Sequence, residues 1–342
     1  MKINSVLVTG GAGFIGSNFV QHCLDNDPDM KIYIIDSLTY AANILNVPKS
    51  DRVELYYGSI VHSTFLLKEL IEKVDAVVHF AAESAVSRSV LDNKIFVETD
   101  VIGTMTLAEI ALKSKIKKFI HISSSEVYGT AKGDCSMNEK QLLEPCSPYA
   151  GAKCAADRLI FSYWYTYKFP AIIVRPFNNY GPGQHLEKVV PKFIVQSLLE
   201  SPMTISGDGE AERDWLYVED NCEAIFKILT QSEEFDHGEV FNVGTGVASC
   251  VNDIATYIEA LFREKGIYVK KEYVDSRPGQ VKRHIADFSK IQQRYGWSPR
   301  TSLDAGLRKT INWYKNNENI WHHQLHLMHT YIFENGGKRV CY

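Results

Sequence analysis

The chain has 342 residues, of which 45% are hydrophobic and 23% are charged, as in an ordinary globular protein. A formal net charge of −4 offers no basic surface for nucleic acid, and no apolar run is long enough to span a membrane. The seven cysteines are scattered without a Cys-x-x-Cys pair, which favours reduced thiols in a cytoplasmic protein over disulfides or a metal site. We therefore expect no nucleic-acid partner, no membrane partner and no bound metal.

The first predicted strand runs into a glycine-rich turn. Gly10, Gly13 and Gly16 stand where the strand gives way to a helix, and this spacing lets the backbone turn tightly and approach a pyrophosphate. A second strand leads into Asp36. An acidic residue there accepts hydrogen bonds from ribose hydroxyls and repels a 2′-phosphate, so the pattern predicts NAD as the cofactor.

Strands then alternate with helical stretches along the chain. Such alternation produces βαβ units, a parallel sheet and right-handed crossovers. We predict an α/β fold: a Rossmann-type doubly wound parallel sheet over residues 1–176, which some later segments join, a smaller substrate-binding lobe mainly over 177–315, and a tail over 316–342. The predicted strands are residues 5–8, 31–35, 53–57, 76–80, 118–122 and 171–174, and the predicted helices include residues 93–114, 148–167 and 187–199.

The helix predicted at residues 148–167 is apolar and aromatic on more than one face. Its side chains would fill the core or pack against a second copy of the chain, and the sequence leaves both open. With the helix at 93–114, it predicts a homodimer held by a four-helix bundle.

Tyr149 and Lys153 are candidate catalytic residues. They lie four residues apart and so share one face of a helix. A nearby ammonium favours the ionised phenol, so we expect Tyr149 to take up a proton at neutral pH. The apolar strand before them ends in three serines and Glu126, at the kind of strand end where open parallel sheets bind ligands.

The C-terminal third carries cations and a histidine-rich tail. Lys188, Arg213 and Arg277 could clamp a ligand diphosphate. The tail contains His322, His323, His326 and His329, and without a Cys or carboxylate at ligand spacing we expect an exposed amphipathic helix, not a metal site.

The chain resembles the extended short-chain dehydrogenase/reductase family, which includes the NAD-dependent nucleotide-sugar epimerases and dehydratases. The resemblance lies in the glycine turn, Asp36, Ser124 and the Tyr149/Lys153 pair, which together match the signature of that family. Within that family the chain is most similar to the dTDP-glucose 4,6-dehydratases, over about residues 4–315. The matching stretches include residues 38–41, 81–84, 126–129, 147–149, 178–182, 187–188, 213–220 and 277–279.

The resemblance implies the ligands and the residues that hold them. NAD would be bound by Gly10, Gly13, Phe14, Ile15, Gly16, Asp36, Ser37, Thr39, Ser59, Ile60, Ala81, Ala82, Ser84, Thr99, Tyr149, Lys153 and Asn179. The substrate, a nucleotide-diphosphate sugar such as a dTDP- or UDP-hexose, would be bound by Ser84, Ser124, Asn178, Glu187, Lys188, Val189, Thr204, Ser206, Arg213, Asn242 and Arg277.

The resemblance also implies a lyase reaction, a 4,6-dehydration with Ser124, Ser125, Glu126, Tyr149 and Lys153 as catalytic residues. Tyr149, helped by Lys153, would remove the proton of the sugar 4-hydroxyl while hydride leaves C4 for NAD. Glu126 would then take the C5 proton, water would leave from C6, and the hydride would return to C6.

One departure from the dehydratase pattern keeps other reactions open. Where those enzymes carry Thr-Asp-Glu, this chain has Ser124, Ser125 and Glu126, and a serine is too weak an acid to protonate the departing hydroxyl. The Ser-Glu pair resembles GDP-mannose 4,6-dehydratases and UDP-glucuronate decarboxylases instead. The alternatives are a UDP-sugar decarboxylase, a 4-epimerase, a 5,6-dehydratase, and a catalytically silent module that binds nucleotide sugar or NAD.

Overall fold

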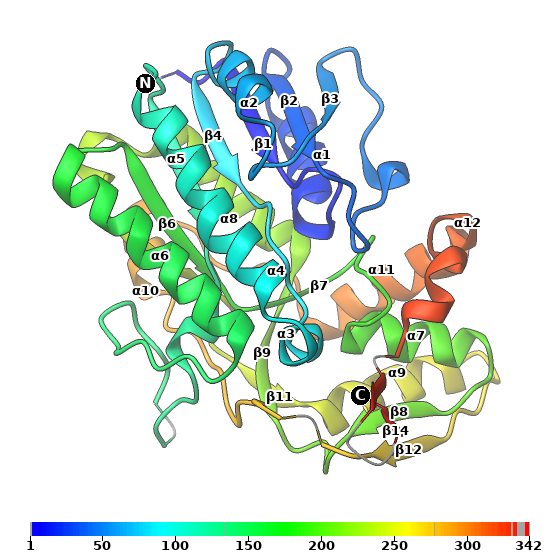
Figure 1. Ribbon diagram of the computed structural model, residues 1–342. Helices are drawn as coiled ribbons and strands as arrows, with labels where there is room; N and C mark the ends of the chain where they lie inside the picture. Colours follow the sequence, from blue (N-terminus) through cyan, green and yellow to red (C-terminus); the bar gives the residue numbers. More distant parts are fainter. Residues whose placement is uncertain (1, 134, 277, 330, 334–338, 342) are drawn as a thin grey trace.

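A seven-stranded sheet forms the centre of the protein, which is described by a computed structural model over residues 2–133, 135–276, 278–329, 331–333 and 339–341 (Figure 1). All its strands run parallel, in the order β10-β6-β5-β4-β1-β2-β3. The strands are β1 (Ser5–Thr9), β2 (Lys31–Asp36), β3 (Val53–Tyr57), β4 (Ala76–His79), β5 (Lys118–Ile122), β6 (Ala171–Pro176) and β10 (Val240–Val243). The order reverses at β1, as in a doubly wound Rossmann fold, and confirms the predicted fold class.

Helices cover both faces of this sheet. The strands are therefore buried on both sides, which suits their apolar, β-branched sequences. One face packs against α1 (Phe14–Asn26), α8 (Val218–Gln231) and α10 (Ser289–Tyr295). The other packs against α2 (Thr64–Ile71), α5 (Thr104–Leu112) and α6 (Pro148–Tyr167). No helix within the described ranges is long and apolar enough to cross a membrane.

Most predicted elements appear close to their predicted bounds. The strands at 53–57 and 118–122 and the helix at 148–167 match residue for residue. The helix predicted at 93–114 consists of α4 (Lys94–Phe96), a π-helical stretch η2 (Val97–Gly103) and α5. Such π-helical stretches often occur at functional sites, and this one carries Thr99 and Asp100 toward the sheet edge discussed below.

A second region follows β6 in the chain. Its three-stranded sheet contains β7 (Asn178–Tyr180), β9 (Glu212–Tyr217) and β11 (Ala248–Cys250), and a two-stranded sheet pairs β8 (Met203–Ser206) with β12 (Lys271–Val274). Helices α7 (Val189–Leu198), α9 (Val251–Arg263) and α11 (Leu303–Asn316) share an apolar core with these strands. We call this region the C-terminal lobe. The domain boundaries at 176 and 315 stay predictions.

The histidine-rich tail does not form the single amphipathic helix that we expected. It contains a short α12 (Glu318–Trp321), a 3₁₀ helix η5 (His322–Leu327) and the pair β13 (Tyr331–Phe333) and β14 (Arg339–Cys341). Trp321 is buried, and its indole donates to the Tyr314 carbonyl at 2.7 Å. The buried indole holds the tail against α11. A 3₁₀ helix has three residues per turn, so His322 and His326, four residues apart, do not share one face of it.

Candidate active site

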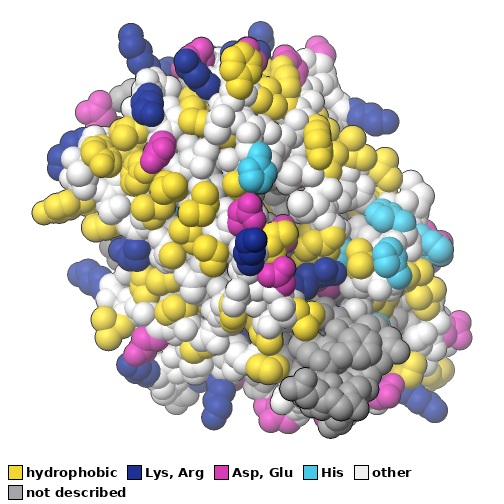
Figure 2. Space-filling model, viewed as in Figure 1, with side chains coloured by type: hydrophobic (Ala, Val, Ile, Leu, Met, Phe, Trp, Pro, Cys, Tyr) yellow, Lys and Arg dark blue, Asp and Glu magenta, His cyan; other side chains and the backbone are white. Residues whose placement is uncertain are grey.

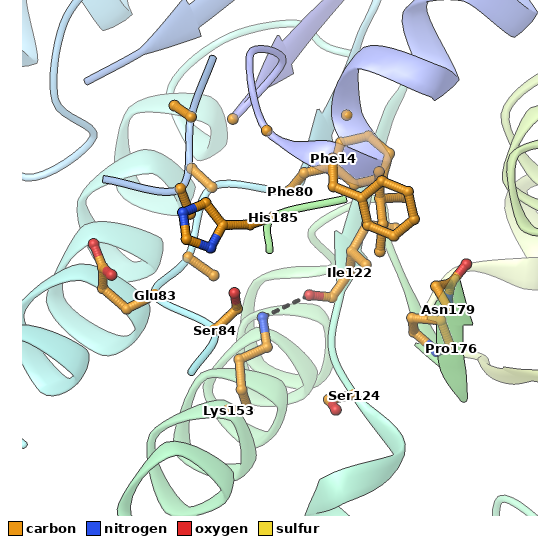
Figure 3. A pocket seen from close by; sticks show the side chains of 18 of the residues that line it. Phe14, Phe80, Glu83, Ser84, Ile122, Ser124, Lys153, Pro176, Asn179 and His185 are labelled. Atoms are coloured by element: carbon orange, nitrogen blue, oxygen red, sulfur yellow. Dashed lines mark hydrogen bonds between the residues drawn. The ribbon is translucent and has the colours of Figure 1, made fainter. Parts of the chain in front are cut away.

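A cavity of about 380 Å³ lies where the carboxyl ends of the parallel strands face the C-terminal lobe. The first turn of α1, the ends of β2, β4, β5 and β6, and the start of α7 all contribute to its wall. Figure 3 shows Phe14 and Phe80 at one end of it, with Lys153 and Ser124 at the other and Asn179 to the side. Ligands bind at this edge in doubly wound sheets, so the cavity is the candidate active site.

The glycine turn forms one wall of the cavity with bare backbone. Gly10 has a φ of +70°, and a Cβ there would lie 2.7 Å from the Ala81 nitrogen. A Cβ on Gly16 would lie 2.3 Å from the Gly10 carbonyl oxygen, so both positions require glycine. The N-terminus of α1 has no side-chain cap, which leaves its first amides to a ligand.

Asp36 is fixed in the wall next to this turn. Its Oδ2 accepts from the Ala12 amide at 2.9 Å, and its Oδ1 accepts from the Leu38 amide at 2.8 Å. Bare glycine backbone, an uncapped helix start and a carboxylate at the end of β2 together fit a dinucleotide whose ribose carries free hydroxyls. All the residues predicted to bind NAD, from Gly10 to Asn179, line this one cavity.

The five predicted catalytic residues line the same cavity. Ser125 and Glu126 begin the 3₁₀ turn η3 (Ser125–Tyr128), where Ser124 caps the turn by accepting from the Glu126 amide at 3.2 Å. Tyr149 and Lys153 lie on the first turns of α6, which Pro148 starts and Ser147 caps by accepting from the Ala150 amide. Two capped helix starts therefore hold these side chains at one end of the cavity.

The surroundings of Tyr149 affect the protonation of its phenol. Burial raises the pKa of Tyr149, and a hydrogen bond with Ser124 offsets this only in part. The Lys153 ammonium donates one hydrogen bond to the Ile122 carbonyl at 2.7 Å (Figure 3). Proton uptake by Tyr149 with the help of Lys153, which the spacing predicted, stays a prediction.

Two carboxylates that the sequence analysis missed act electrostatically on Lys153. Burial lowers the pKa of Lys153, and Asp100 and Asp157 counteract this. Burial also raises the pKa of Asp100 to about 7, although Lys153 opposes the rise. One oxygen of Asp100 accepts from the Glu83 amide at 2.7 Å. Of the two carboxylates, Asp100 is the one whose pKa lies near neutral pH.

A buried ion pair ties α6 to the sheet one turn after Lys153. Arg175 on β6 donates to both oxygens of Asp157, at 2.8 and 2.9 Å, and to the Tyr128 hydroxyl at 2.8 Å. Burial alone would raise the pKa of Asp157, but the guanidinium holds it well below its usual range. This network fixes α6, β6 and η3 relative to one another.

A smaller cavity of about 120 Å³ adjoins the first and shares Asn178, Glu187, Lys188 and Val189 with it. Thr204, Ser206 and Arg213, three further predicted substrate residues, line its wall, together with Lys192 and Gln280, which the sequence analysis had not assigned. Its cationic side chains suit a diphosphate, and its place suits a ligand that extends from the first cavity into the lobe.

Glu187 is the centre of a polar cluster between the two cavities. It accepts from the Tyr40 hydroxyl at 2.8 Å and from Arg88 Nε at 3.1 Å, and the Arg88 guanidinium lies 3.7 Å above the Tyr40 ring. Burial alone would raise the pKa of Glu187, but Lys188, His185 and these partners hold it below its usual value. Lys188 also donates to the Ser84 carbonyl at 2.6 Å.

Two predicted substrate residues are not placed in either cavity. Asn242 is fully buried, with its carboxamide bonded to the Tyr128 hydroxyl and the Met137 carbonyl, so it supports η3 from behind. Arg277 lies outside the described residues. Among the described residues, no three His, Cys, Asp or Glu side chains come together as a metal-binding cluster.

A doubly wound sheet whose glycine turn shares a cavity with Ser124, Tyr149 and Lys153 defines a protein of the extended short-chain dehydrogenase/reductase class. Comparison with known proteins agrees. The family model for GDP-mannose 4,6 dehydratase matches residues 7–310. The chain belongs to this family, as the sequence resemblance predicted.

Several relatives and solved structures match most of the chain. The low-salt glycan biosynthesis protein Agl12 of Haloferax volcanii is 41% identical over 315 residues, which cover 90% of this chain and 98% of that protein. A dTDP-glucose 4,6-dehydratase of Shigella flexneri is 35% identical over 341 residues, 92% of this chain and 93% of its own. The structure of the Streptomyces venezuelae dTDP-glucose 4,6-dehydratase DesIV, with NAD bound, has a TM-score of 0.87 at 36% identity and covers 94% of this chain and 99% of that one.

Proposed function

We propose that this protein is an NAD-dependent nucleotide-sugar 4,6-dehydratase that acts on a dTDP- or UDP-hexose. One observation carries the proposal: Ser124, Glu126 and Tyr149 share a cavity with the glycine turn and Asp36, and this cavity opens toward cationic side chains of the lobe. The names of the relatives agree with the activity, the enzyme type and the cofactor predicted from the sequence, which are thereby confirmed.

The reaction needs proton transfers that the chain's own residues can make. NAD, when bound, supplies hydride chemistry at the sugar. Tyr149 takes the proton of the sugar 4-hydroxyl, and Ser124 hydrogen-bonds the same oxygen. Glu126 takes the C5 proton, which the C4 ketone acidifies, and the same carboxyl then protonates the hydroxide that leaves C6. Ser125, 2% exposed, orients this hydroxyl by a hydrogen bond.

The decarboxylase alternative needs a cation for a C6 carboxylate. Arg88 or Arg213 could serve, and Arg88 is already paired with Glu187 and stacked on Tyr40. An added sugar carboxylate would compete with Glu187 for this guanidinium, whereas a neutral C6 hydroxyl would not. This contact favours the dehydratase over the decarboxylase.

A panel of nucleotide sugars tests the proposal. The purified protein is incubated with dTDP-, UDP-, GDP- and CDP-hexoses and with UDP-glucuronate, and the products are identified by mass. We expect loss of one water from a dTDP- or UDP-hexose. Loss of carbon dioxide from UDP-glucuronate, an epimer of unchanged mass, or no reaction would each contradict the proposal. Cofactor extracted from the denatured protein should be NAD, and a predominance of NADP would contradict the role of Asp36.

We also propose that the protein is a homodimer. Apolar side chains are exposed side by side on α3 (Val86–Leu91), α4, η2 and α6. Figure 2 shows hydrophobic side chains gathered over this part of the surface. The exposed members are Val90, Leu91, Ile95, Val97, Ile102, Tyr165 and Tyr167, and we call them the helical apolar face. A location in the cytoplasm stays a prediction that rests on the cysteine pattern.

A further inference from the structure

His284 is a fully buried histidine that faces both Ser125 and Glu126. It follows β12 and lies 159 positions along the chain from Ser125, yet Ser125 Oγ is 3.5 Å from its Nδ1. The same nitrogen is 3.8 Å from Glu126 Oε1. Its Nδ1 therefore lies directly behind the two side chains that the proposed elimination uses at C5 and C6.

The other ring nitrogen fixes the tautomer of His284. Nε2 lies 2.7 Å from the Gly129 carbonyl oxygen. A carbonyl can only accept, so Nε2 carries the hydrogen, and the neutral ring presents an unprotonated Nδ1 to Ser125 and Glu126. Burial lowers the pKa of His284, while Glu126 raises it and Arg213 lowers it further. Phe177 packs edge-on against the ring, with 6.3 Å between centroids, and adds no charge.

We propose that His284 is a positioning residue for the elimination, an inference that rests on the proposed 4,6-dehydratase function. The unprotonated Nδ1 accepts the Ser125 hydroxyl, which turns the lone pairs of Ser125 Oγ toward the cavity and the 6-hydroxyl of the sugar. Nδ1 contacts Ser125 and Nε2 contacts Gly129, so the ring also braces the two ends of η3, the turn that carries Glu126. His284 thereby holds Ser125 and Glu126 in place for the proton transfers at C5 and C6.

The proton and electron balance closes within the substrate and Glu126. The C5–H bond breaks and its proton passes to Glu126, and the electron pair forms the C5–C6 double bond as the C6–O bond breaks. The departing oxygen takes the proton from Glu126 and leaves as water. His284 keeps its Nε2 hydrogen throughout and acts only through Ser125 and Glu126.

The test compares His284→Gln with the parent protein in single turnovers. A glutamine amide can still donate to the Gly129 carbonyl, but it offers no imidazole lone pair at the Nδ1 position. We expect elimination to slow by about tenfold to a hundredfold, while C4 oxidation, read as NADH formation, stays within about threefold. The ratio of the elimination rate to the oxidation rate should therefore fall, which general loss of packing would not produce. His62→Gln is the control, since His62 is 73% exposed.

Two results would overturn the inference. One is elimination at the parental rate, and the other is equal slowing of both steps, which lost packing alone explains. If the variant does not fold, ¹⁵N NMR of the His284 ring in the parent protein provides the test. An unprotonated Nδ1 at neutral pH, with a signal that shifts in Glu126→Gln, supports the inference. A protonated Nδ1 overturns it. A parent that removes no water from any nucleotide sugar overturns the proposed function itself, which is a separate result.

Discussion

Glu126 is the single side chain on which the proposed elimination depends, since it serves first as base and then as acid. In Glu126→Gln, the changed carboxyl takes no part in C4 oxidation, so NADH should accumulate in amounts stoichiometric with the protein. Elimination should be lost, because an amide takes up no proton at C5. Stopped-flow absorbance and product mass measure the two steps separately.

Two comparisons sharpen the assignment of Glu126. Ser125→Ala should slow elimination by only about tenfold, as for one lost neutral hydrogen bond. Glu144→Gln changes an exposed carboxylate whose partner is Lys132 and should leave both steps unchanged. Dehydration by Glu126→Gln near the parental rate would show that another residue removes the C5 proton.

Some site residues could be predicted from the sequence because their signals are local. Gly10, Gly16 and Asp36 follow strands at fixed spacing, and Tyr149 and Lys153 share a helix face, so short stretches suffice. His284 has no such signal. It meets Ser125 only because the chain returns to the site after 159 residues, and no motif links the two positions.

Other contacts at the site have no local signal either. The four-residue spacing placed Lys153 near Tyr149 but could not show that the strand-end carbonyl of Ile122 would take its ammonium. Asn242 was assigned to the substrate from its position in the family pattern. Its amide is instead bonded to Tyr128 and Met137 behind the site, which only three-dimensional packing reveals.

At the scale of elements, the Asp157–Arg175 pair fastens α6 to β6 and so holds Tyr149 and Lys153 at the strand ends. Both side chains are almost fully buried. Asp157→Asn leaves the guanidinium without its counter-charge, so we expect the free energy of unfolding to fall by about 3–5 kcal/mol. Urea denaturation followed by circular dichroism measures the change.

An exposed ion pair provides the matched control for this prediction. Asp304 and Arg308 are about half exposed and lie one turn apart on α11, so Asp304→Asn should cost less than about 1 kcal/mol. Equal losses in the two variants would mean that the buried pair does not contribute more than a surface pair, and that α6 is held by its apolar contacts alone.

Elements were easier to predict than their assembly. The strand at 118–122 and the helix at 148–167 have strong apolar patterns and clear start signals, including Ser147 and Pro148. The tail misled because its histidine spacing fits an α-helix, whereas burial of Trp321 against α11 selects a 3₁₀ path. Tertiary contacts of this kind override local periodicity.

At the scale of the whole molecule, the helical apolar face predicts self-association. We expect a dimeric mass in solution at micromolar concentration, measured by analytical ultracentrifugation. Tyr165→Glu places a charge on α6 at a side chain that is 67% exposed, and it should shift the mass toward the monomer. Tyr268→Glu changes a similarly exposed tyrosine outside this face and should leave the dimer intact. A monomeric parent would contradict the proposal.

Acid sensitivity should also be a property of the whole fold, because several histidines are buried in neutral form. His79 and His121 are cross-strand neighbours on β4 and β5 with ring centroids 5.3 Å apart. Burial lowers the pKa of His121 to about 3, and Lys153 lowers it further, against the opposing effect of Asp157. Burial lowers the pKa of His185 to about 4 and holds that of His79 well below its usual value.

The sign of this effect follows from proton uptake. Below about pH 6.5 these histidines bind protons in the unfolded chain but not in the native protein, so the free energy of unfolding falls as the pH falls. Each such histidine contributes a slope of about 1.4 kcal/mol per pH unit, or about 2 kcal/mol between pH 6.5 and pH 5. Above about pH 7.5 the histidines contribute no pH dependence.

His121→Phe isolates one of these contributions. Neither ring nitrogen of His121 has a hydrogen-bond partner among the described residues, so a phenyl ring loses no polar contact there. We expect the drop in unfolding free energy between pH 7.5 and pH 5 to be about 2 kcal/mol smaller in this variant than in the parent. Denaturant titrations at both pH values measure it, with His62→Phe as the control because His62 is 73% exposed. An unchanged drop in His121→Phe would mean that the native protein protonates His121 as readily as the unfolded chain does.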